Sequence, residues 1–236
     1  MAGGNVGGAW RIGATVRRTT GPWTPAVHAL LAHLGPRLPH VPRVLGFDDR
    51  GREVLTFLPG TVIEPGGLTE PQLRSLLAWT RALHEAVADF SHGGPWRFFP
   101  VGGATLVGHN DIAPYNACFD GDEVTGVFDW DLAGPSTPLL ELAFIAWNCV
   151  PLWEDIGAAA AAARLQIIAT TYGPVPAGAI LAAVPRRIQL MLDGIPAAAA
   201  GDAGMATLML GGEPQRSQLA LADLVRRIPA IAGHLR

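Results

Sequence analysis

The sequence contains no lysine, and all 17 of its basic residues are arginine. Any phosphate contact that other proteins make through a lysine must therefore come from arginine or from a backbone N–H. Charged residues make up only 16% of the chain, and the net charge is −3. Proteins that bind nucleic acid usually carry a basic stripe, so this charge predicts no nucleic-acid partner. With 49% apolar residues, the chain is expected to fold rather than to remain disordered.

Cysteine and long apolar runs are also scarce. Cys118 and Cys149 fall in predicted core segments without the spacing of a metal site, which is typical of buried thiols in a reducing compartment. The longest apolar stretch, residues 156–169, contains Arg164 and is too short and too polar to span a bilayer. The N-terminus lacks the charged-then-apolar layout of a signal peptide. We therefore expect a cytoplasmic protein with no membrane partner.

Two pairs of short strands are predicted in the N-terminal part. Residues 9–19 form a hairpin that turns near Gly13, and residues 43–47 and 53–58 form a second pair across a polar turn. A glycine-rich leader, residues 3–8, precedes the first hairpin. Its glycines would let the backbone approach a phosphate, although they are equally typical of a frayed terminus.

Helices are predicted between the strand pairs and through the second half of the chain. Residues 25–34 have apolar residues at helical spacing, with Pro25 at the first helical position. Residues 69–90 run amphipathically after Thr69, and residues 137–150 have the composition of a buried helix. The remainder is helical in composition and is expected to be punctuated at its prolines and glycines: Pro174, Pro176, Pro185, Pro196, Gly211, Gly212 and Pro229.

This order of elements predicts an α+β chain with two lobes. A small β-rich N-lobe covers residues 1–58, and a mainly helical C-lobe covers residues 59–236 with a short hairpin embedded at 104–129. A cleft between two lobes is a natural place for a ligand.

The most informative stretch lies between residues 106 and 131. His109, Asp111 and Asn116 follow the pattern H-x-D-x-x-x-x-N, and Asp129 stands 18 positions beyond Asp111. This is the spacing of a kinase catalytic loop and its second metal ligand. Asp111 could accept the proton of a hydroxyl group, while Asn116 and Asp129 offer the hard oxygen ligands that Mg²⁺ prefers.

The same stretch has two other possible interpretations. Aspartate and asparagine are common turn residues, so the spacing could be a chance match, but the flanking apolar runs and the preceding helix favour a functional loop. A metal-dependent hydrolase using Asp111, Asp129 and Asp131 is disfavoured because no cluster of histidine and carboxylate ligands accompanies them.

Residues 109–116 (HNDIAPYN) and 127–135 (VFDWDLAGP) resemble the aminoglycoside phosphotransferase family, whose members have a protein-kinase-like fold. Residues 3–34 resemble the family's N-terminal lobe. Residues 52–60 (REVLTFLPG) resemble its strand and hinge beside the nucleotide base, and residues 80–87 (TRALHEAV) its helix before the catalytic loop.

This resemblance implies a bilobal, protein-kinase-like enzyme that transfers the γ-phosphate of ATP or GTP, with Mg²⁺, to a hydroxyl of a small molecule. It implies that Asp111 is the catalytic base, that His109 supports the catalytic loop, and that Asn116 and Asp129 hold the magnesium ion. The nucleotide would lie between the lobes, with its base near three consecutive residues: Thr56, Phe57 and Leu58.

The chain departs from the family on the phosphate side. Kinases pair a strand lysine with a helix glutamate, whereas this strand carries Arg17 and Arg18. Arginine can clamp a phosphate with two hydrogen bonds. Because neighbouring strand residues face opposite sides, at most one of the two faces the cleft, and we favour Arg18. The helix offers Val27 and His28 where the acid is expected, so the partner of the arginine is missing from the sequence pattern.

The sequence also suggests a role or position for three further residues. Asp131 replaces the usual glycine and is expected to be a cap or an additional acid near the metal. Glu141 stands where the family commonly has an aspartate that supports the catalytic loop. His84 is expected on the surface of its helix or between the lobes.

The acceptor is left open by the sequence. Beyond residue 150, six acids stand against seven arginines without an acidic cluster, which does not favour a polycationic aminoglycoside. An antibiotic of another kind, a sugar or an amino alcohol fits at least as well. The alternative function is a catalytically impaired protein that kept the fold and binds a nucleotide or metabolite, although retention of Asp111, Asn116 and Asp129 together argues against it.

Overall fold

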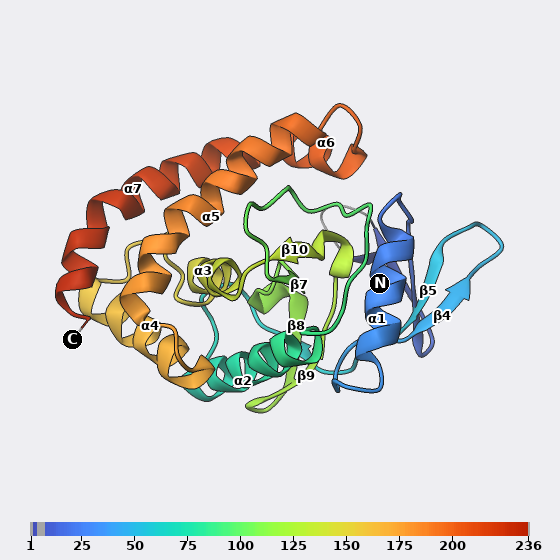
Figure 1. Ribbon diagram of the computed structural model, residues 1–236, viewed down its shortest axis with the longest axis horizontal. Helices are drawn as coiled ribbons and strands as arrows, with labels where there is room; N and C mark the ends of the chain where they lie inside the picture. Colours follow the sequence, from blue (N-terminus) through green and yellow to red (C-terminus); the bar gives the residue numbers. More distant parts are fainter. Residues whose placement is uncertain (1, 4–7, 236) are drawn as a thin grey trace.

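The structure is a computed structural model that describes residues 2–3 and 8–235. Its N-terminal part is an antiparallel sheet in the order β1-β2-β3-β5-β4, with one helix, α1 (Thr24–Leu34), packed beside it (Figure 1). Both predicted strand pairs are confirmed, and Gly13 turns the first with a positive φ of 61°. Residues 4–7 of the glycine-rich leader lie outside the described residues. The strands are β1 (Ala2–Gly3), β2 (Ala9–Ile12), β3 (Thr15–Arg18), β4 (Val44–Phe47) and β5 (Glu53–Thr56).

The middle of the chain forms two small sheets, whose strands flank the candidate catalytic loop at residues 109–116. β6 (Thr61–Val62), β8 (Ala117–Asp120) and β9 (Glu123–Val127) form one. β7 (Leu106–Gly108) pairs with β10 (Gly134–Ser136) in the other.

The expectation of a single hairpin over residues 104–129 was therefore wrong. The hairpin is β8–β9, and the run before the loop pairs instead with a strand beyond Asp129. A three-residue strand made of glycine, proline and serine has no strand pattern of its own, because glycine and proline are depleted in strands.

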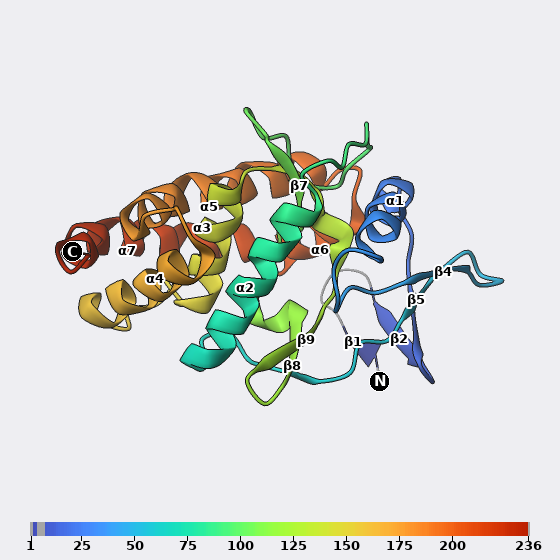
Figure 2. The ribbon, with the colours of Figure 1, turned by 60° about the horizontal axis from the view of Figure 1, so that its bottom comes forward.

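The C-terminal part is helical, as expected, and Figures 1 and 2 show its helices grouped on the side away from the N-terminal sheet. Pro185 and Pro196 lie inside α5 and Pro229 inside α7, so the expectation that they end helices was wrong. An internal proline costs a helix about 3 kcal/mol, but α5 offsets this by burying an apolar face against α3 and α7. The helices are α2 (Glu70–Ala86), α3 (Pro138–Cys149), α4 (Ala158–Tyr172), α5 (Ala177–Ala198), α6 (Ala203–Leu210) and α7 (Glu213–Gly233).

The core of the helical part anchors both ends of the catalytic loop. Val107 precedes the loop and Phe119 follows it, and both are buried. Ile112, within the loop, is also buried, and α3 beneath it has an almost wholly buried sequence from Leu140 to Cys149. The loop is therefore held at a fixed position over α3.

None of the described helices is long and apolar enough by itself to cross a membrane. α4 and α5 pass that test only when taken together across a bend of 104°.

The start of α2 depends on a capping box. The Thr69 hydroxyl accepts a hydrogen bond from the backbone N–H of Gln72, and the Gln72 side chain accepts one from the backbone N–H of Thr69. We predict that Thr69→Ala lowers the free energy of unfolding by about 1 kcal/mol. Thr170→Ala is the matched control, because the Thr170 hydroxyl bonds only its own helix in α4. Urea denaturation of both variants tests this, and equal losses would contradict it.

Candidate active site

The catalytic loop, residues 109–116, is tied down by a buried carboxylate from α3. Glu141 accepts the backbone N–H of His109 at 3.2 Å and that of Asn110 as well. Asn110 has a left-handed backbone with φ of 62°. A Cβ at Gly108 would lie 2.6 Å from the Glu141 carboxyl carbon, so glycine leaves room for this acid. Glu141 thus supports the loop, as the resemblance implies.

Glu141 is held in turn by His84 of α2. Nε2 of His84 lies 3.0 Å from Glu141, and Nδ1 lies 2.7 Å from the Tyr172 hydroxyl of α4. Burial raises the pKa of Glu141, but the hydrogen bond and charge of His84 and further partners outweigh burial and lower it below its ordinary value. The expectation that His84 lies on the surface or between the lobes was wrong, because amphipathic spacing does not reveal which neighbours cover a helix.

His109 bonds backbone groups through both ring nitrogens. Its Nδ1 accepts the N–H of Asp111 at 3.2 Å, so its Nε2 carries the proton and donates it to the Phe128 carbonyl at 3.0 Å. The ring is fully buried against Trp130, and burial lowers its pKa. A neutral ring with both nitrogens engaged is arranged to support the loop rather than to transfer a proton.

Asp111 faces the site with both carboxylate oxygens hydrogen-bonded. Oδ1 accepts the Tyr115 hydroxyl at 3.1 Å, and Oδ2 accepts the Asn116 amide at 2.8 Å. Burial and the neighbouring charge of Asp129 raise the pKa of Asp111 to about 7. A carboxylate with a pKa near neutrality is suited to accept a proton at physiological pH.

Asp129 stands directly beyond β9 in a left-handed backbone conformation, with φ of 63°. Asp111, Asn116 and Asp129 together offer carboxylate and amide oxygens, the ligand type of Mg²⁺. A cation here would relieve the repulsion that raises the pKa of Asp111. Within the described ranges no group of three His, Cys, Asp or Glu side chains is placed for a metal, so the Asn116 amide is needed to complete the set. These residues fit a magnesium ion.

Arg18 of β3 reaches across to these carboxylates. Its Nη2 lies 2.6 Å from Asp129 and 3.0 Å from Asp131. Burial lowers the pKa of Arg18, but the nearby carboxylates outweigh burial and raise it above its ordinary value. Arg17 lies on the other face of the strand, 3.8 Å from Asp48, and is not part of the site. The preference for Arg18 over Arg17 therefore agrees with the geometry.

The missing partner of Arg18 is found on the neighbouring strand. Glu53 of β5 stands opposite Arg18 in the sheet register, and its carboxylate lies 3.5 Å from Nη1 of Arg18. His28 of α1 bonds the same carboxylate at 2.8 Å. The sequence pattern left this partner unassigned because the helix carries no acid there: the strand supplies the acid, and the helix supplies a histidine that holds it.

Within the described residues, Asp131 makes no helix-capping hydrogen bond, and it shares Nη2 of Arg18 with Asp129. Besides Arg18, it lies 3.2 Å from Arg97, so two guanidinium groups share its carboxylate.

Residues 56–58 connect the N-terminal sheet to the helical part, as the resemblance implies for a hinge. Thr56 exchanges hydrogen bonds with Arg43, and the Phe57 N–H donates to the Ala14 carbonyl at 2.9 Å. The Arg11 guanidinium lies 3.6 Å from the centre of the Phe57 ring.

Sequence reasoning missed Arg187. This residue of α5 is 1% exposed, lies between the rings of Phe98 and Phe144, and donates to the Asn110 carbonyl at 2.6 Å. Burial lowers its pKa to about 10. It holds the same left-handed residue that Glu141 holds from the other side. No local signal could have found it, because 77 positions separate it from Asn110.

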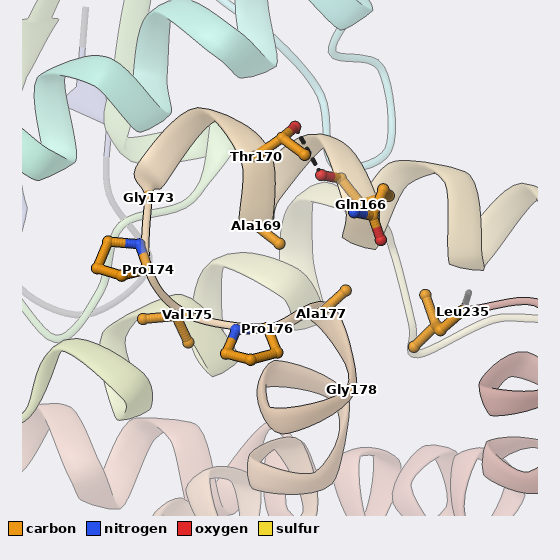
Figure 3. A pocket seen from close by; sticks show the side chains of 10 residues that line it. All are labelled: Gln166, Ala169, Thr170, Gly173, Pro174, Val175, Pro176, Ala177, Gly178 and Leu235. Carbon is orange, nitrogen blue, oxygen red and sulfur yellow. Dashed lines mark hydrogen bonds between the residues drawn. The ribbon is translucent and has the colours of Figure 1, made fainter.

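A surface hollow of about 500 Å³ lies elsewhere, between the end of α4, the start of α5 and Leu235 (Figure 3). It is lined by apolar and small residues together with Gln166 and Thr170. It includes none of the site residues predicted from the sequence.

A small antiparallel sheet with one helix, followed by a helical part that carries the H-x-D-x-x-x-x-N loop, defines a kinase-like phosphotransferase fold. Residues 94–177 match the model of the phosphotransferase enzyme family. The amicoumacin kinase hAmiN, solved in complex with AMP-PNP, Ca²⁺ and Ami, is similar with a TM-score of 0.64 at 13% identity, covering 94% of this chain and 84% of that chain. A thermostable mutant of the aminoglycoside phosphotransferase APH(4)-Ia, in complex with AMP-PNP and hygromycin B, has a TM-score of 0.57 at 15% identity, covering 99% and 94%.

Residues 94–177 are thus similar to the phosphotransferase enzyme family, and the expected α+β, kinase-like fold is confirmed. Among curated proteins, the trifolitoxin immunity protein of Rhizobium leguminosarum bv. trifolii is 34% identical over 164 residues. That match covers 66% of this chain and 63% of the relative, so the matched part spans less than two thirds of the relative's length.

We predict that Glu141→Gln lowers the free energy of unfolding by about 1–3 kcal/mol, because it weakens the acceptor of two buried N–H groups. The folded-state pKa of Glu141 lies below its ordinary value of 4.5. Its stabilising contribution is therefore complete above that pH and is lost as pH falls toward the folded-state pKa. Denaturation at a series of pH values should show the gap between wild type and variant narrowing below about pH 4.5. A gap that stays constant down to pH 3 would contradict this.

Proposed function

We propose that this protein is an ATP- or GTP-dependent phosphotransferase that transfers the γ-phosphate to a hydroxyl group of a small molecule. The observation that carries the proposal is the convergence of Asp111, Asn116 and Asp129 in one site, opposite the guanidinium of Arg18. The match of residues 94–177 to the model of the phosphotransferase enzyme family supports it.

In the proposed reaction Asp111 orients the acceptor hydroxyl and takes its proton. The acceptor oxygen forms a bond to the γ-phosphorus, and the bond from that phosphorus to the bridging oxygen breaks, which leaves the nucleoside diphosphate. The proton on Asp111 then passes to solvent. Arg18 would bind the phosphates of the nucleotide through its guanidinium fork.

Asn116 and Asp129 would hold a magnesium ion. When bound, such an ion neutralises charge on the β- and γ-phosphates. Two structural relatives were solved with AMP-PNP and one of them also with Ca²⁺, which supports a nucleotide and a divalent cation as ligands of this fold.

The charges around the site favour an acceptor that is not a polycation. Asp131 is paired with two arginines, and Asp202 of the neighbouring helix end is paired with Arg97 at 2.7 Å. These carboxylates are therefore already neutralised by the chain. The relative named as an immunity protein adds toxic compounds to the candidate acceptors, beside sugars and amino alcohols.

The alternative is a protein that binds a nucleotide without transferring phosphate. Thermal denaturation with ATP alone and with ATP plus Mg²⁺ separates the candidates at low cost. The phosphotransferase requires stabilisation that depends on the metal, and its absence would contradict the proposal.

We predict that Asp111→Asn lowers phosphate transfer by about 10²- to 10⁴-fold, because the general base is lost. Nucleotide affinity should change little. Transfer is measured as ATP consumption over a panel of hydroxyl metabolites and antibiotics, and affinity by titration with AMP-PNP. Asp120→Asn, at an exposed acid of β8, is the control. Full turnover by Asp111→Asn would refute the assignment of the base.

We predict that Asp129→Asn removes the Mg²⁺ dependence of nucleotide binding, because the variant lacks the anionic oxygen that the cation needs. Titrations with AMP-PNP at several Mg²⁺ concentrations measure this. An unchanged dependence on Mg²⁺ would place the cation at other residues.

A further inference from the structure

Asp131 is shared by two arginines that come from different parts of the chain. Arg18 of β3 lies 3.0 Å from it and Arg97 lies 3.2 Å from it. The three side chains are 11%, 13% and 7% exposed for Asp131, Arg18 and Arg97, so water screens these ion pairs only partly. A carboxylate that pairs with two cations holds each less firmly than it would hold one alone, because its lone pairs are divided between them.

Arg97 belongs to the segment between α2 and β7, which runs between α1 and α6 (Figure 1). Its Nε and Nη2 bond the two oxygens of Asp202, both at 2.7 Å, and its Nη1 is left for Asp131. The guanidinium also lies 4.3 Å from the ring centre of Trp23, at the start of α1. Arg97 therefore contacts both parts of the molecule.

Asp202 connects Arg97 to α6. One of its oxygens caps that helix by accepting the N–H groups of Gly204 at 2.8 Å and Met205 at 3.1 Å. Hydrogen bonds from Arg97 lower the pKa of Asp202, which keeps the carboxylate charged. A row of alternating charges thus runs from α6 through Arg97 and Asp131 to Arg18.

We propose that Arg97 is a positioning residue: it shares the Asp131 carboxylate with Arg18, weakens the pairing of Asp131 with Arg18, and so favours the binding of nucleotide phosphates to the Arg18 guanidinium. Asp202 determines how strongly Arg97 pairs with Asp131, because both carboxylates bind the guanidinium of Arg97. This couples the position of α6 to the phosphate side of the site. The inference rests on the proposed nucleotide-binding role of Arg18.

The competition predicts opposite effects for two substitutions. In Arg97→Gln, Asp131 has only Arg18 to pair with, so Arg18 is held more firmly and nucleotide affinity falls. In Asp202→Asn, the fork of Arg97 turns to Asp131, so Arg18 is released and nucleotide affinity rises. A purely structural role would instead lower stability and affinity together in both variants.

The experiment is calorimetric titration of the intact protein with AMP-PNP and Mg²⁺, with melting temperatures recorded beside it. The expected change in dissociation constant is about fivefold upward for Arg97→Gln and about fivefold downward for Asp202→Asn, the size of one partly screened ion pair. Asp193→Asn is the matched control, because Asp193 of α5 is exposed and bonds only Gln189.

A double variant sharpens the test. In an Asp131→Asn background Arg18 keeps its ion pairs with Asp129 and Glu53 but no longer pairs with a charged residue 131, so adding Arg97→Gln should leave the affinity of that background unchanged. If wild type binds the nucleotide but both single variants shift affinity in the same direction, or neither shifts it, this inference is overturned while the proposed function stands. If wild type shows no metal-dependent nucleotide binding, the proposed function and this inference both fall.

Discussion

The catalytic loop depends on one buried carboxylate. Glu141 accepts hydrogen bonds from the backbone N–H groups of His109 and Asn110. Without this acceptor, each would be a buried, unsatisfied donor at a cost of about 1–3 kcal/mol. Because the backbone is fixed at Asn110, the side chain of the next residue, Asp111, has a fixed orientation. Its two carboxylate oxygens accept hydrogen bonds from Tyr115 and Asn116 of the same loop. Arg187 holds the carbonyl of Asn110 from the opposite helix. The Asp111 carboxylate is therefore positioned both by Tyr115 and Asn116, which bond it directly, and by Glu141 and Arg187, which hold the backbone of the preceding residue.

A single guanidinium, that of Arg18, organises the carboxylates on the side of the site that faces the N-terminal sheet. Arg18 contacts acids from both parts of the molecule: Glu53 from its own sheet, and Asp129 and Asp131 from beyond β9. The ammonium group of a lysine is a compact charge, whereas the planar guanidinium of an arginine can pair with several carboxylates at once. His28 holds Glu53 in place. The two parts of the fold thus meet through ion pairs around one arginine.

The candidate catalytic loop could be singled out from sequence because its pattern is local: Asp111, Asn116 and Asp129 stand at fixed spacings between apolar runs. Because side chains alternate between the two faces of a strand, the sequence also predicted that only one of Arg17 and Arg18 faces the site. The features that the sequence did not predict are those that depend on tertiary contacts. The pairing of Arg18 with Glu53 depends on strand register, and the burial of His84 depends on where α4 packs. β10 exists only because β7 lies beside it. Prolines inside α5 are tolerated because its neighbours bury the helix, which no local pattern reveals.

An arginine at the phosphate position also changes the reactivity of the site. A guanidinium stays protonated throughout the accessible pH range and is a very poor nucleophile, whereas a lysine amine can be acylated. In a chain without lysine side chains, nucleotide analogues that carry an amine-reactive acyl group have no side-chain amine to capture beside Arg18. Profiling methods that recognise kinases by such acylation would pass over this protein, and dicarbonyl reagents, which condense with guanidinium groups, are the chemistry suited to labelling it.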